Sequence, residues 1–558
     1  MSKKGGRTAA ESPPAGKVTP SYRPRQAEKS APCQAGCANC GDIRGWIAIV
    51  AQRDKLGLSV QEACSRAWRI IADVNPFPAT LGRICPHPCE SRCNRGQYDE
   101  PLAINAMERF LGDFAIGEGL SLPRLGESGE GRSVAVIGAG PSGLSFAYQM
   151  ARRGHRVTVY EAREKPGGML RYGVPDYRLP QSVLDAEIDR IVALGVALVT
   201  GQRLGRDFTL ESLRCEYDAV YLGIGAQRGL GLDVPGVAGP GVLIGTEFLE
   251  AVNDGRQTPI GASVVVVGGG NTAIDAARTA RRLGAAATIL YRRSREEMPA
   301  VAHEVEAALE EGVELVLLAA PTAIRRTEDG MIRAVQASRM QLGEPDSSGR
   351  RAPVAREGSD FEVPAETVIL AISQVPALDG LEEFAAGQSW LAADEQGVVS
   401  DFVLAGGDAL HLGIAGNAIV QGRRAAEALH ARLTAEAVAP DAPDRPDEPI
   451  GSDGVRLESR DHSSEARPPS LAPADRVAAG MAEVVAALDE RQFLAEAERC
   501  FSCGSCFGCE QCFMYCTSGC FTRLQQPEPG RYFVLNLEAC KECGKCVEVC
   551  PCGFLEAN

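Results

Sequence analysis

Residues 133–144 read Ser133-Val-Ala-Val-Ile-Gly-Ala-Gly-Pro-Ser-Gly-Leu144, an apolar strand-type run that passes directly into a glycine-rich turn and a helix-like segment. The spacing of Gly138, Gly140 and Gly143 is typical of the first strand–helix turn in a dinucleotide-binding fold. The first glycine permits the tight turn, the second lets the backbone approach a pyrophosphate, and the third lets helix and strand pack closely. The stretch therefore predicts an α/β domain that binds a dinucleotide.

The residue that ends the next predicted strand supports this prediction. The strand covers Arg156–Tyr160 and is followed by Glu161, 23 residues after Gly138. A carboxylate at this distance can accept a hydrogen bond from a ribose 2′-hydroxyl. A glycine-rich turn without any nucleotide is the alternative interpretation.

The motif occurs a second time in residues 263–273, which read Ser263-Val-Val-Val-Val-Gly-Gly-Gly-Asn-Thr-Ala273. This internal duplication favours a flavoprotein with two dinucleotides over a dehydrogenase with a single cofactor. The residues expected to contact the second dinucleotide at this turn are Gly268, Gly270, Asn271 and Thr272.

The two copies differ at the position that reads the ribose. The strand Thr288–Tyr291 of the second copy runs into Arg292 and Arg293, the first of which lies 24 residues after Gly268. Guanidinium groups suit a 2′-phosphate, whereas Glu161 suits an unphosphorylated ribose. We therefore expect FAD at the first motif and NADPH, or NADH, at the second. A solvated basic turn is the alternative for the arginines.

Size and charge narrow the class of protein. A chain of 558 residues is expected to hold several domains, because single cores stop growing at roughly 250–300 residues. The net charge of −15 argues against a nucleic-acid partner. No apolar run reaches the ~20 residues of a membrane span, and the first residues lack the apolar segment of a signal peptide. We expect a cytoplasmic protein.

The 20 cysteines gather in residues 33–93 and 500–552, with only Cys215 between the two groups. Such crowding in a large cytoplasmic chain indicates metal ligation more than disulfides. The N-terminal group has the spacings Cys33-x3-Cys37-x2-Cys40 and Cys85-x3-Cys89-x3-Cys93. These suit iron–sulfur clusters better than zinc, for which two CxxC pairs would be the stronger signal, although a structural zinc remains an alternative.

Two stretches of this region resemble the N-terminal domain of the glutamate synthase small subunit and of dihydropyrimidine dehydrogenase: Asn75-Pro-Phe-Pro-Ala-Thr-Leu-Gly-Arg-Ile-Cys-Pro-His-Pro-Cys-Glu-Ser-Arg-Cys93 and Ile104-Asn-Ala-Met-Glu-Arg109. That family binds two [4Fe–4S] clusters there, one of them with a ligand other than cysteine. The resemblance implies that one cluster is held by Cys37, Cys85, Cys89 and Glu108. It implies that Cys33 and Cys93 hold part of the other. A solvated helical glutamate is the alternative for Glu108.

The same family resemblance covers the flavin site and extends over roughly residues 33–430. The loop-like run Pro166–Pro180 resembles the family's flavin-side segment, which implies that Gly168 lies near the isoalloxazine. The run Phe402–Asp408, followed by Gly416–Ala426, resembles the closing FAD motif. This implies that Asp408 holds the ribityl chain; a turn-forming aspartate is the alternative.

The C-terminal cysteines carry the repeated signature of a bacterial two-cluster ferredoxin: Cys506-x2-Cys509-x2-Cys512-x3-Cys516 and Cys540-x2-Cys543-x2-Cys546-x3-Cys550-Pro551. In that fold the fourth cysteine of each run ligates the other cluster. We therefore expect Cys550 to join the first three cysteines of the first run, and Cys516 to join the first three of the second. Thr517 stands where proline usually follows.

One cysteine pair is missing from the N-terminal domain. In the family, a CxxC that follows a segment resembling Glu-Ala-x-Arg-Cys precedes the position of Cys33. Here that segment occurs only at Glu496-Ala-Glu-Arg-Cys-Phe-Ser-Cys503. We hypothesise that Cys500 and Cys503 complete the set of Cys33 and Cys93, which gives four clusters per chain; two unligated thiols are the alternative.

A flexible linker precedes this pair in the sequence, so the pair can reach the N-terminal domain in two ways. A linker of ~40 residues has a reach of about 35 Å. The pair can therefore return to its own chain or cross to a neighbour in a homodimer with exchanged C-terminal domains.

The predicted fold is α/β, with two interleaved Rossmann-like dinucleotide-binding domains, an α-helical N-terminal iron–sulfur domain and a C-terminal bacterial-type ferredoxin domain. The expected order is a tail (1–32), the helical iron–sulfur domain (33–130), the FAD domain (131–255 and 375–434) around the NAD(P)H domain (256–374), a flexible linker (435–475) and a helix with the ferredoxin domain (476–558).

These parts predict an NAD(P)H:acceptor oxidoreductase that passes electrons between NAD(P)H, FAD and [4Fe–4S] clusters, in either direction, with no acid–base residue required. A redox enzyme is expected to dock at the ferredoxin domain. By resemblance the partner is dissimilatory sulfite reductase, glutamate synthase, a 2-oxoacid:ferredoxin oxidoreductase or an aromatic acyl-CoA reductase. The alternative is a non-enzymatic electron-transfer and assembly subunit that binds FAD but turns over no nicotinamide.

Overall fold

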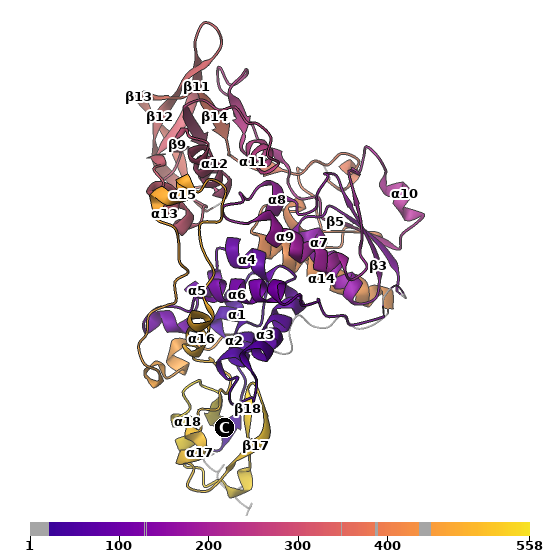
Figure 1. Ribbon diagram of the computed structural model, residues 1–558, viewed down its shortest axis with the longest axis vertical. Coiled ribbons are helices and arrows are strands. Elements are labelled where there is room, and N and C mark those ends of the chain that lie inside the picture. Colours follow the sequence, from indigo (N-terminus) through magenta and orange to yellow (C-terminus); the bar gives the residue numbers. More distant parts are fainter. Residues whose placement is uncertain are drawn as a thin grey trace, which may run out of the picture.

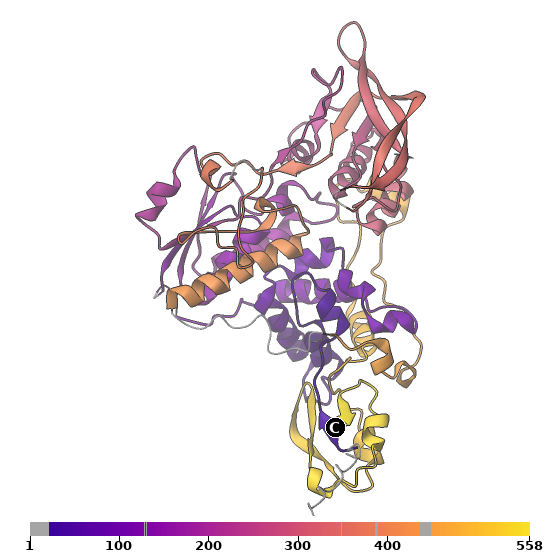
Figure 2. The same ribbon diagram turned by 180° about the vertical axis from the view of Figure 1, so that it is seen from behind.

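The computed structural model describes residues 22–127, 129, 131–346, 349–385, 389–434 and 448–557. A group of helices occupies the centre of the molecule, with the ferredoxin domain at one end of the long axis and the two dinucleotide domains at the other (Figure 1). The reverse view shows the same arrangement, with the long helix α14 running along the flavin domain (Figure 2). The predicted fold class is confirmed.

The N-terminal domain consists of short helices joined by cysteine-bearing turns. The span from Ile43 to Val74 forms two helices, because the chain turns at Gly57, whose φ is +65°. A capping box of Ser59 and Glu62 starts the second of them. The helices are α1 Pro32–Gly36, α2 Ile43–Ala51, α3 Val60–Val74, α4 Pro78–Ile84, α5 Pro88–Ser91 and α6 Ile104–Gly117.

The flavin domain is a parallel sheet of five strands in the order β16-β5-β2-β3-β4. Strand β16 comes from the end of the interrupted domain and pairs with β5, which confirms the interleaving of the two domains. The elements are β2 Ser133–Ile137, α7 Pro141–Arg152, β3 Arg156–Glu161, α8 Met169–Tyr172, α9 Gln181–Val192, β4 Ala197–Thr200, α10 Leu210–Arg214, β5 Ala219–Leu222, β16 Val403–Ala405 and α14 Ala415–Thr434.

The second dinucleotide domain has a parallel sheet in the order β10-β9-β8-β14-β7. An antiparallel sheet, β11-β12-β13, is attached to it. The elements are β7 Val242–Ile244, α11 Gly245–Asn253, β8 Ser263–Val267, α12 Asn271–Arg282, β9 Ala286–Tyr291, α13 Ala302–Glu310, β10 Glu314–Leu317, β11 Ala319–Arg326, β12 Ile332–Pro345, β13 Arg351–Pro364 and β14 Thr367–Leu370.

The boundary expected between residues 255 and 256 is wrong. Strand β7 pairs in parallel with β14, so residues 242–253 belong to the second sheet. The chain passes from the flavin domain to the second dinucleotide domain at β6 (Arg228–Gly229) and returns at β15 (Gln374–Val375). These two short strands pair with each other. The edge strand β7 precedes the glycine motif, so the motif alone does not place it.

Residues 448–489, here called the strap, differ from the expected flexible linker and helix. Residues 435–447 of that linker lie outside the described residues. The strap contains α15 (Pro473–Ala478), and α16 (Glu490–Glu498) follows it. The helix expected before the ferredoxin domain, within residues 476–558, is therefore interrupted, because the chain turns at Gly480, whose φ is +61°. The strap runs from the ferredoxin domain past the N-terminal helices to α13 and back to α16 (Figure 1).

Contacts along the strap explain why it is ordered. Ile450 and Val484 are buried, and Leu488 joins the core of the N-terminal domain. At the far end Arg476 pairs with Glu310 of α13 at 2.7 Å, and the Val484 N–H donates to the carbonyl of Tyr177 at 3.2 Å. The strap therefore ties the second dinucleotide domain to the iron–sulfur domain.

The ferredoxin domain carries β17 Phe521–Glu528, β18 Arg531–Leu535, α17 Gln511–Tyr515, α18 Lys545–Glu548 and β19 Leu555–Ala557. Strand β1 (Pro24–Gln26) pairs antiparallel with β19, so the described end of the N-terminal tail lies along the C-terminal domain. The first 21 residues of the expected tail lie outside the described residues.

Among the helices of the described ranges, none is both long and apolar enough to pass through a bilayer.

Candidate functional site

The first glycine motif has the backbone geometry that its spacing predicts. Gly138 has φ +101°, and a Cβ there would lie 2.4 Å from the carbonyl oxygen of Gly223. A Cβ on Gly143 would lie 2.0 Å from the carbonyl oxygen of Gly138. A Cβ on Gly140 would meet no atom closer than the Gly168 Cα at 3.9 Å, and both glycines line a cavity of about 150 Å³. The bare backbone at this turn leaves room for a pyrophosphate.

Glu161 lies at the end of this cavity, where the motif predicts the ribose. Its carboxylate accepts hydrogen bonds from the N–H groups of Ala139 at 2.8 Å and Arg163 at 2.9 Å. Burial raises the pKa of this carboxyl from its usual value. Each carboxylate oxygen accepts more than one hydrogen bond, so the group can still receive a ribose hydroxyl. The chemistry of these donors and acceptors fits FAD.

Asp408 lines both the first cavity and a second one of about 820 Å³. The Gly413 N–H donates to its Oδ1 at 3.0 Å, and burial raises the pKa of its carboxyl to about 6. Asp408 therefore lies between the two cavities, and its contact with the ribityl chain of a flavin stays a prediction.

The raised pKa of Asp408 predicts a pH-dependent affinity for FAD. A ribityl hydroxyl donates to the ionised carboxylate, so binding favours the deprotonated group. Affinity should therefore be full above pH 7 and fall as the pH is lowered through 6. Fluorescence titration of the apoprotein with FAD between pH 5 and 8 measures this. Asp408→Asn should bind FAD more weakly at pH 8 and lose the pH dependence; an unchanged pH profile would contradict the role of Asp408.

The second cavity contains the predicted nicotinamide site. Gly268 has φ +148°, and a Cβ on Gly270 would meet nothing within 4 Å. Asn271 Oδ1 accepts from the Val301 N–H at 2.9 Å, and Thr272 Oγ1 lies 3.5 Å from Gln374 Nε2, which donates to it. All four predicted residues of this turn line the cavity. The opposite wall is formed by flavin-domain residues, among them Met169, Asp408 and Ile414.

The two arginines expected at the 2′-phosphate have different surroundings. Arg292 is exposed and lines the cavity. Arg293 is only 2% exposed; its Nε donates to the carbonyl of Arg351 at 2.8 Å and its Nη2 pairs with Asp346. Arg350, which sequence reasoning missed, also lines the cavity. It lies on the hairpin between β12 and β13, far from the glycine motif in sequence.

Cys37, Cys85, Cys89 and Glu108 surround a cavity of about 40 Å³ in the N-terminal domain, here called the flavin-proximal site. Burial is the largest cause of the raised pKa values of these groups, and Glu108 raises the pKa of each of the three thiols further. Glu108 accepts from Asn75 Nδ2 at 2.8 Å, so its carboxylate points into the site and is not a solvated surface group. Cys85 also lines the large dinucleotide cavity.

Cys33, Cys93, Cys500 and Cys503 are brought together in one chain, and we call this set the bridging site. Cys500, Cys93 and Cys503 all raise the pKa of the buried Cys33 thiol, after burial itself. Asn94 Nδ2 donates to the Cys503 sulfur at 3.5 Å. The four residues named by the hypothesis from the missing CxxC are therefore neighbours, and their ligation of a cluster stays a prediction.

The ferredoxin cysteines form the two sets expected from the crossed pattern. Cys506, Cys509, Cys512 and Cys550 line one cavity, here called the first ferredoxin site, and Cys550 raises the pKa of each of the other three thiols after burial. At the second ferredoxin site, Cys516 and Cys543 raise the pKa of Cys546, and Cys516 and Cys540 raise that of the neighbouring Cys520. Cys543 is exposed, so the second site opens to the surface.

All 20 cysteines are free thiols. Within the described ranges, no three His, Cys, Asp or Glu side chains lie close enough together to hold a single metal ion. The flavin-proximal site and the first ferredoxin site are arranged around cavities, with donors from separate segments. Of the thiols without a predicted role, Cys520 and Cys552 are buried beside the ferredoxin sets, Cys64 is buried in α3, and Cys40 and Cys215 are exposed.

The fold and these sites define a flavoprotein with two dinucleotide-binding domains and cysteine sets for iron–sulfur clusters. Residues 132–427 match the pyridine nucleotide-disulphide oxidoreductase family, and the chain belongs to it. Residues 22–120 match dihydropyrimidine dehydrogenase domain II, which carries 4Fe-4S clusters, and residues 533–556 match a 4Fe-4S binding domain. The chain is an iron–sulfur flavoprotein of the glutamate synthase small-subunit type.

Three relatives illustrate where such chains occur. The β subunit of an NADP(+)-dependent formate dehydrogenase from Moorella thermoacetica is 37% identical over 89% of this chain and 73% of its own length. The β subunit of an NADPH-Fe(3+) oxidoreductase from Geobacter sulfurreducens is 41% identical over 62% of this chain, which spans about half (52%) of that relative. The glutamate synthase [NADPH] small chain of Azospirillum brasilense is 34% identical over 73% of this chain and 87% of its own length.

Proposed function

We propose that this chain oxidises NADPH at the second dinucleotide domain and delivers the electrons, through FAD and four [4Fe–4S] clusters, to a partner redox enzyme. One observation supports the proposal above the others. The cavity of about 820 Å³ is lined at once by the nicotinamide motif, by flavin-domain residues such as Asp408, and by Cys85 of the flavin-proximal site. Bound FAD exchanges two electrons with a nicotinamide and single electrons with clusters.

The residues of this cavity hold the reactants together. Gly268 and Gly270 leave space for the nicotinamide dinucleotide, while Asp408 positions the flavin from the opposite wall. A buried pair of Arg178 and Asp275, at 2.8 Å, joins the flavin loop to α12 at the cavity wall. The pair would hold the two domains together around the cavity that takes the nicotinamide and the flavin.

The four cysteine sets follow one another along the molecule. The flavin-proximal and bridging sites alternate along the same two turns. Cys33 lies in α1 and Cys37 directly follows this helix, while Cys89 lies in α5 and Cys93 follows two residues after its end. Two residues separate Cys503 of the bridging site from Cys506 of the first ferredoxin site. Each cysteine run of the ferredoxin domain supplies three cysteines to one ferredoxin site and the fourth to the other. This order leads from the flavin to the exposed Cys543.

The partner is expected at the end of the ferredoxin domain, where the second site reaches the surface. The names of the three relatives describe subunits or chains of larger redox enzymes, which favours a partner of that kind. A formate dehydrogenase catalytic subunit therefore joins glutamate synthase, dissimilatory sulfite reductase, 2-oxoacid:ferredoxin oxidoreductases and aromatic acyl-CoA reductases as candidates. Free thiols in such number favour the reducing cytoplasm. The bridging site closes within one chain, so no exchanged homodimer is needed.

Anaerobic titration with NADPH tests the proposal. The visible spectrum of the isolated chain should show loss of the oxidised flavin and cluster absorbance, and the chain should reduce an artificial dye with NADPH as donor. A chain that contains FAD but is reduced by neither NADPH nor NADH would instead be a non-enzymatic electron-transfer subunit. Co-purification from native cells would then name the partner.

A further inference from the structure

A guanidinium group lies between the bridging site and the first ferredoxin site. Arg460 of the strap donates from Nη2 to the carbonyl oxygen of Cys500 at 3.1 Å. Its guanidinium carbon lies 4.8 Å from the ring centroid of Phe507, which lines the cavity of the first ferredoxin site. Its Nε is buried and makes no hydrogen bond within the described part of the chain. The guanidinium thus contacts the backbone of a bridging-site cysteine and an aromatic ring beside the first ferredoxin site.

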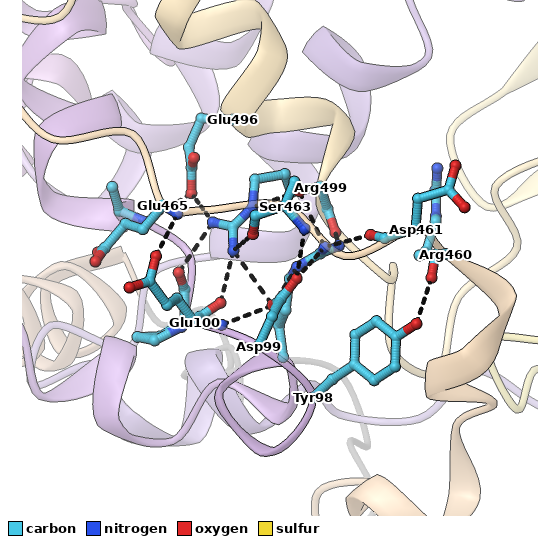
Figure 3. A network of polar contacts seen from close by, with 12 residues as sticks. Tyr98, Asp99, Glu100, Arg460, Asp461, Ser463, Glu465, Glu496 and Arg499 are labelled. Carbon is cyan, nitrogen blue, oxygen red and sulfur yellow. Dashed lines mark hydrogen bonds and ion pairs between the residues drawn. The ribbon is translucent and has the colours of Figure 1, made fainter.

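The strap holds Arg460 in this position through its backbone. Tyr98 donates its hydroxyl to the Arg460 carbonyl oxygen at 2.7 Å (Figure 3). The Tyr98 ring also stacks on His462, with centroids 3.9 Å apart. Next to it the strap is bound by Arg95, which donates to the carbonyl of Asp461 at 2.9 Å. The guanidinium therefore occupies a built position and is not a mobile surface group.

The other arginines around the bridging site have anionic partners. Arg499 lies among carboxylates, with Glu496 at 2.6 Å and Asp99 at 3.3 Å (Figure 3). Arg95 pairs with Asp99 at 2.6 Å. Arg44, which donates to the carbonyl of Cys503 at 2.8 Å, pairs with Glu28 at 2.7 Å.

Arg460 has no carboxylate within ion-pair distance among the described residues, unlike the other three arginines. Lys55 also approaches Phe507, but it is exposed, and water screens its charge. The positive charge of Arg460 therefore acts on the bridging site without compensation.

The flavin-proximal site has the opposite surroundings. Its own set contains the carboxylate of Glu108, and Glu90 directly follows Cys89 in α5. His87 pairs with Glu90 at 2.6 Å at the edge of the site. The flavin-proximal set thus contains a carboxylate, that of Glu108, whereas the bridging set has the guanidinium of Arg460 beside it.

We propose that Arg460 sets the reduction potential of the bridging cluster above that of the flavin-proximal cluster, so that the bridging site is where electrons collect before they enter the ferredoxin domain. The inference rests on the proposed function. Reduction adds one negative charge to a cluster, and a nearby uncompensated cation stabilises that charge. Arg460 acts here as a positioning and tuning residue, since it contacts the ligand backbone and not the reacting atoms.

Redox titration of the full-length, cofactor-loaded chain, followed by electron paramagnetic resonance, tests this. The bridging signal is identified as the one that disappears in the double variant Cys500→Ser with Cys503→Ser. In Arg460→Met the midpoint potential of the bridging signal should fall. The ratio of electrons on the bridging cluster to electrons on the flavin-proximal cluster should then drop by about tenfold or more. Arg460→Lys keeps the charge and should restore most of the potential. Arg456→Met is the matched control, because Arg456 lies on the same strap but is 45% exposed and pairs with Glu458 at 3.0 Å.

An unchanged midpoint in an Arg460→Met chain with full iron content would overturn the proposal and leave the bridging site standing. If Arg460→Met does not load iron, the midpoint potentials of Arg460→Gln and Arg460→Lys are compared instead, because these two variants differ in charge. Equal midpoint potentials would overturn the proposal. Should the cysteine double variant keep all its iron and all its signals, the bridging site itself would be absent, and the proposed four-cluster path would fail with it.

Discussion

Replacing Cys500 and Cys503 together by serine is expected to remove about four iron atoms per chain, the content of one [4Fe–4S] cluster. The physical reason is that two of the four thiolates at the bridging site come from this pair, while Cys33 and Cys93 supply the others. FAD and the ferredoxin signals should remain, because neither depends on these two thiols. Iron analysis, flavin content and electron paramagnetic resonance measure the three outcomes.

The matched control removes two thiols that belong to no set. Cys40 and Cys215 are both exposed, so Cys40→Ser with Cys215→Ser should keep the full iron content. The double variant at 500 and 503 also separates the bridging site from the alternative of unligated thiols at a helix end. Iron content equal to that of the wild type would reject the shared site.

The dinucleotide sites could be predicted because their geometry is local. Gly138 and Gly268 both adopt a positive φ at the turn itself, a backbone conformation that glycine adopts without strain. Glu161 follows its strand directly, so its place at the cavity also follows from sequence. The crossed ferredoxin sets were predictable in the same way, from one repeated spacing.

The bridging site was predictable for a different reason. No local geometry joins residues 33–93 to residues 500–503. The prediction came from counting ligands, because the set of Cys33 and Cys93 lacked two thiols and the CxxC pair of Cys500 and Cys503 had no assigned partner. The structure brings those residues together. Which metal group they hold stays a prediction for iron analysis.

The strap could not be predicted, because its order comes from distant partners. Its sequence is polar and rich in proline, which is typical of a flexible linker. Its segments are held instead by contacts to their backbone, such as Tyr98 to the Arg460 carbonyl and Asn94 Nδ2 to the Ile450 carbonyl at 3.1 Å. Such contacts leave no pattern in the strap's own residues. Strand β7 was misplaced for a similar reason, since its partner β14 lies more than a hundred residues later.

Arg292→Ala is expected to lower kcat/KM for NADPH by roughly 10- to 150-fold, with little effect on NADH. A guanidinium that contacts the 2′-phosphate makes a charge-assisted hydrogen bond of about 1.5–3 kcal/mol, which is the energy behind that range. NADH lacks the phosphate, so its binding does not use the contact. Steady-state rates of dye reduction with each nucleotide measure the ratio. Arg295→Ala is the control, because Arg295 pairs with Glu306 at 2.9 Å and is not among the residues that line the cavity.

Arg293→Ala should behave differently, although sequence places it beside Arg292. Arg293 is buried and bound to Asp346 and to the Arg351 carbonyl, so it holds the β12–β13 hairpin, and with it Arg350, at the cavity wall. Its loss should lower the thermal unfolding midpoint, because a buried ion pair is broken. It should also reduce the preference for NADPH indirectly, through displacement of the hairpin.

Equal wild-type efficiency with NADPH and NADH would show that Arg292 faces solvent in the complex, and the 2′-phosphate site would then be wrong.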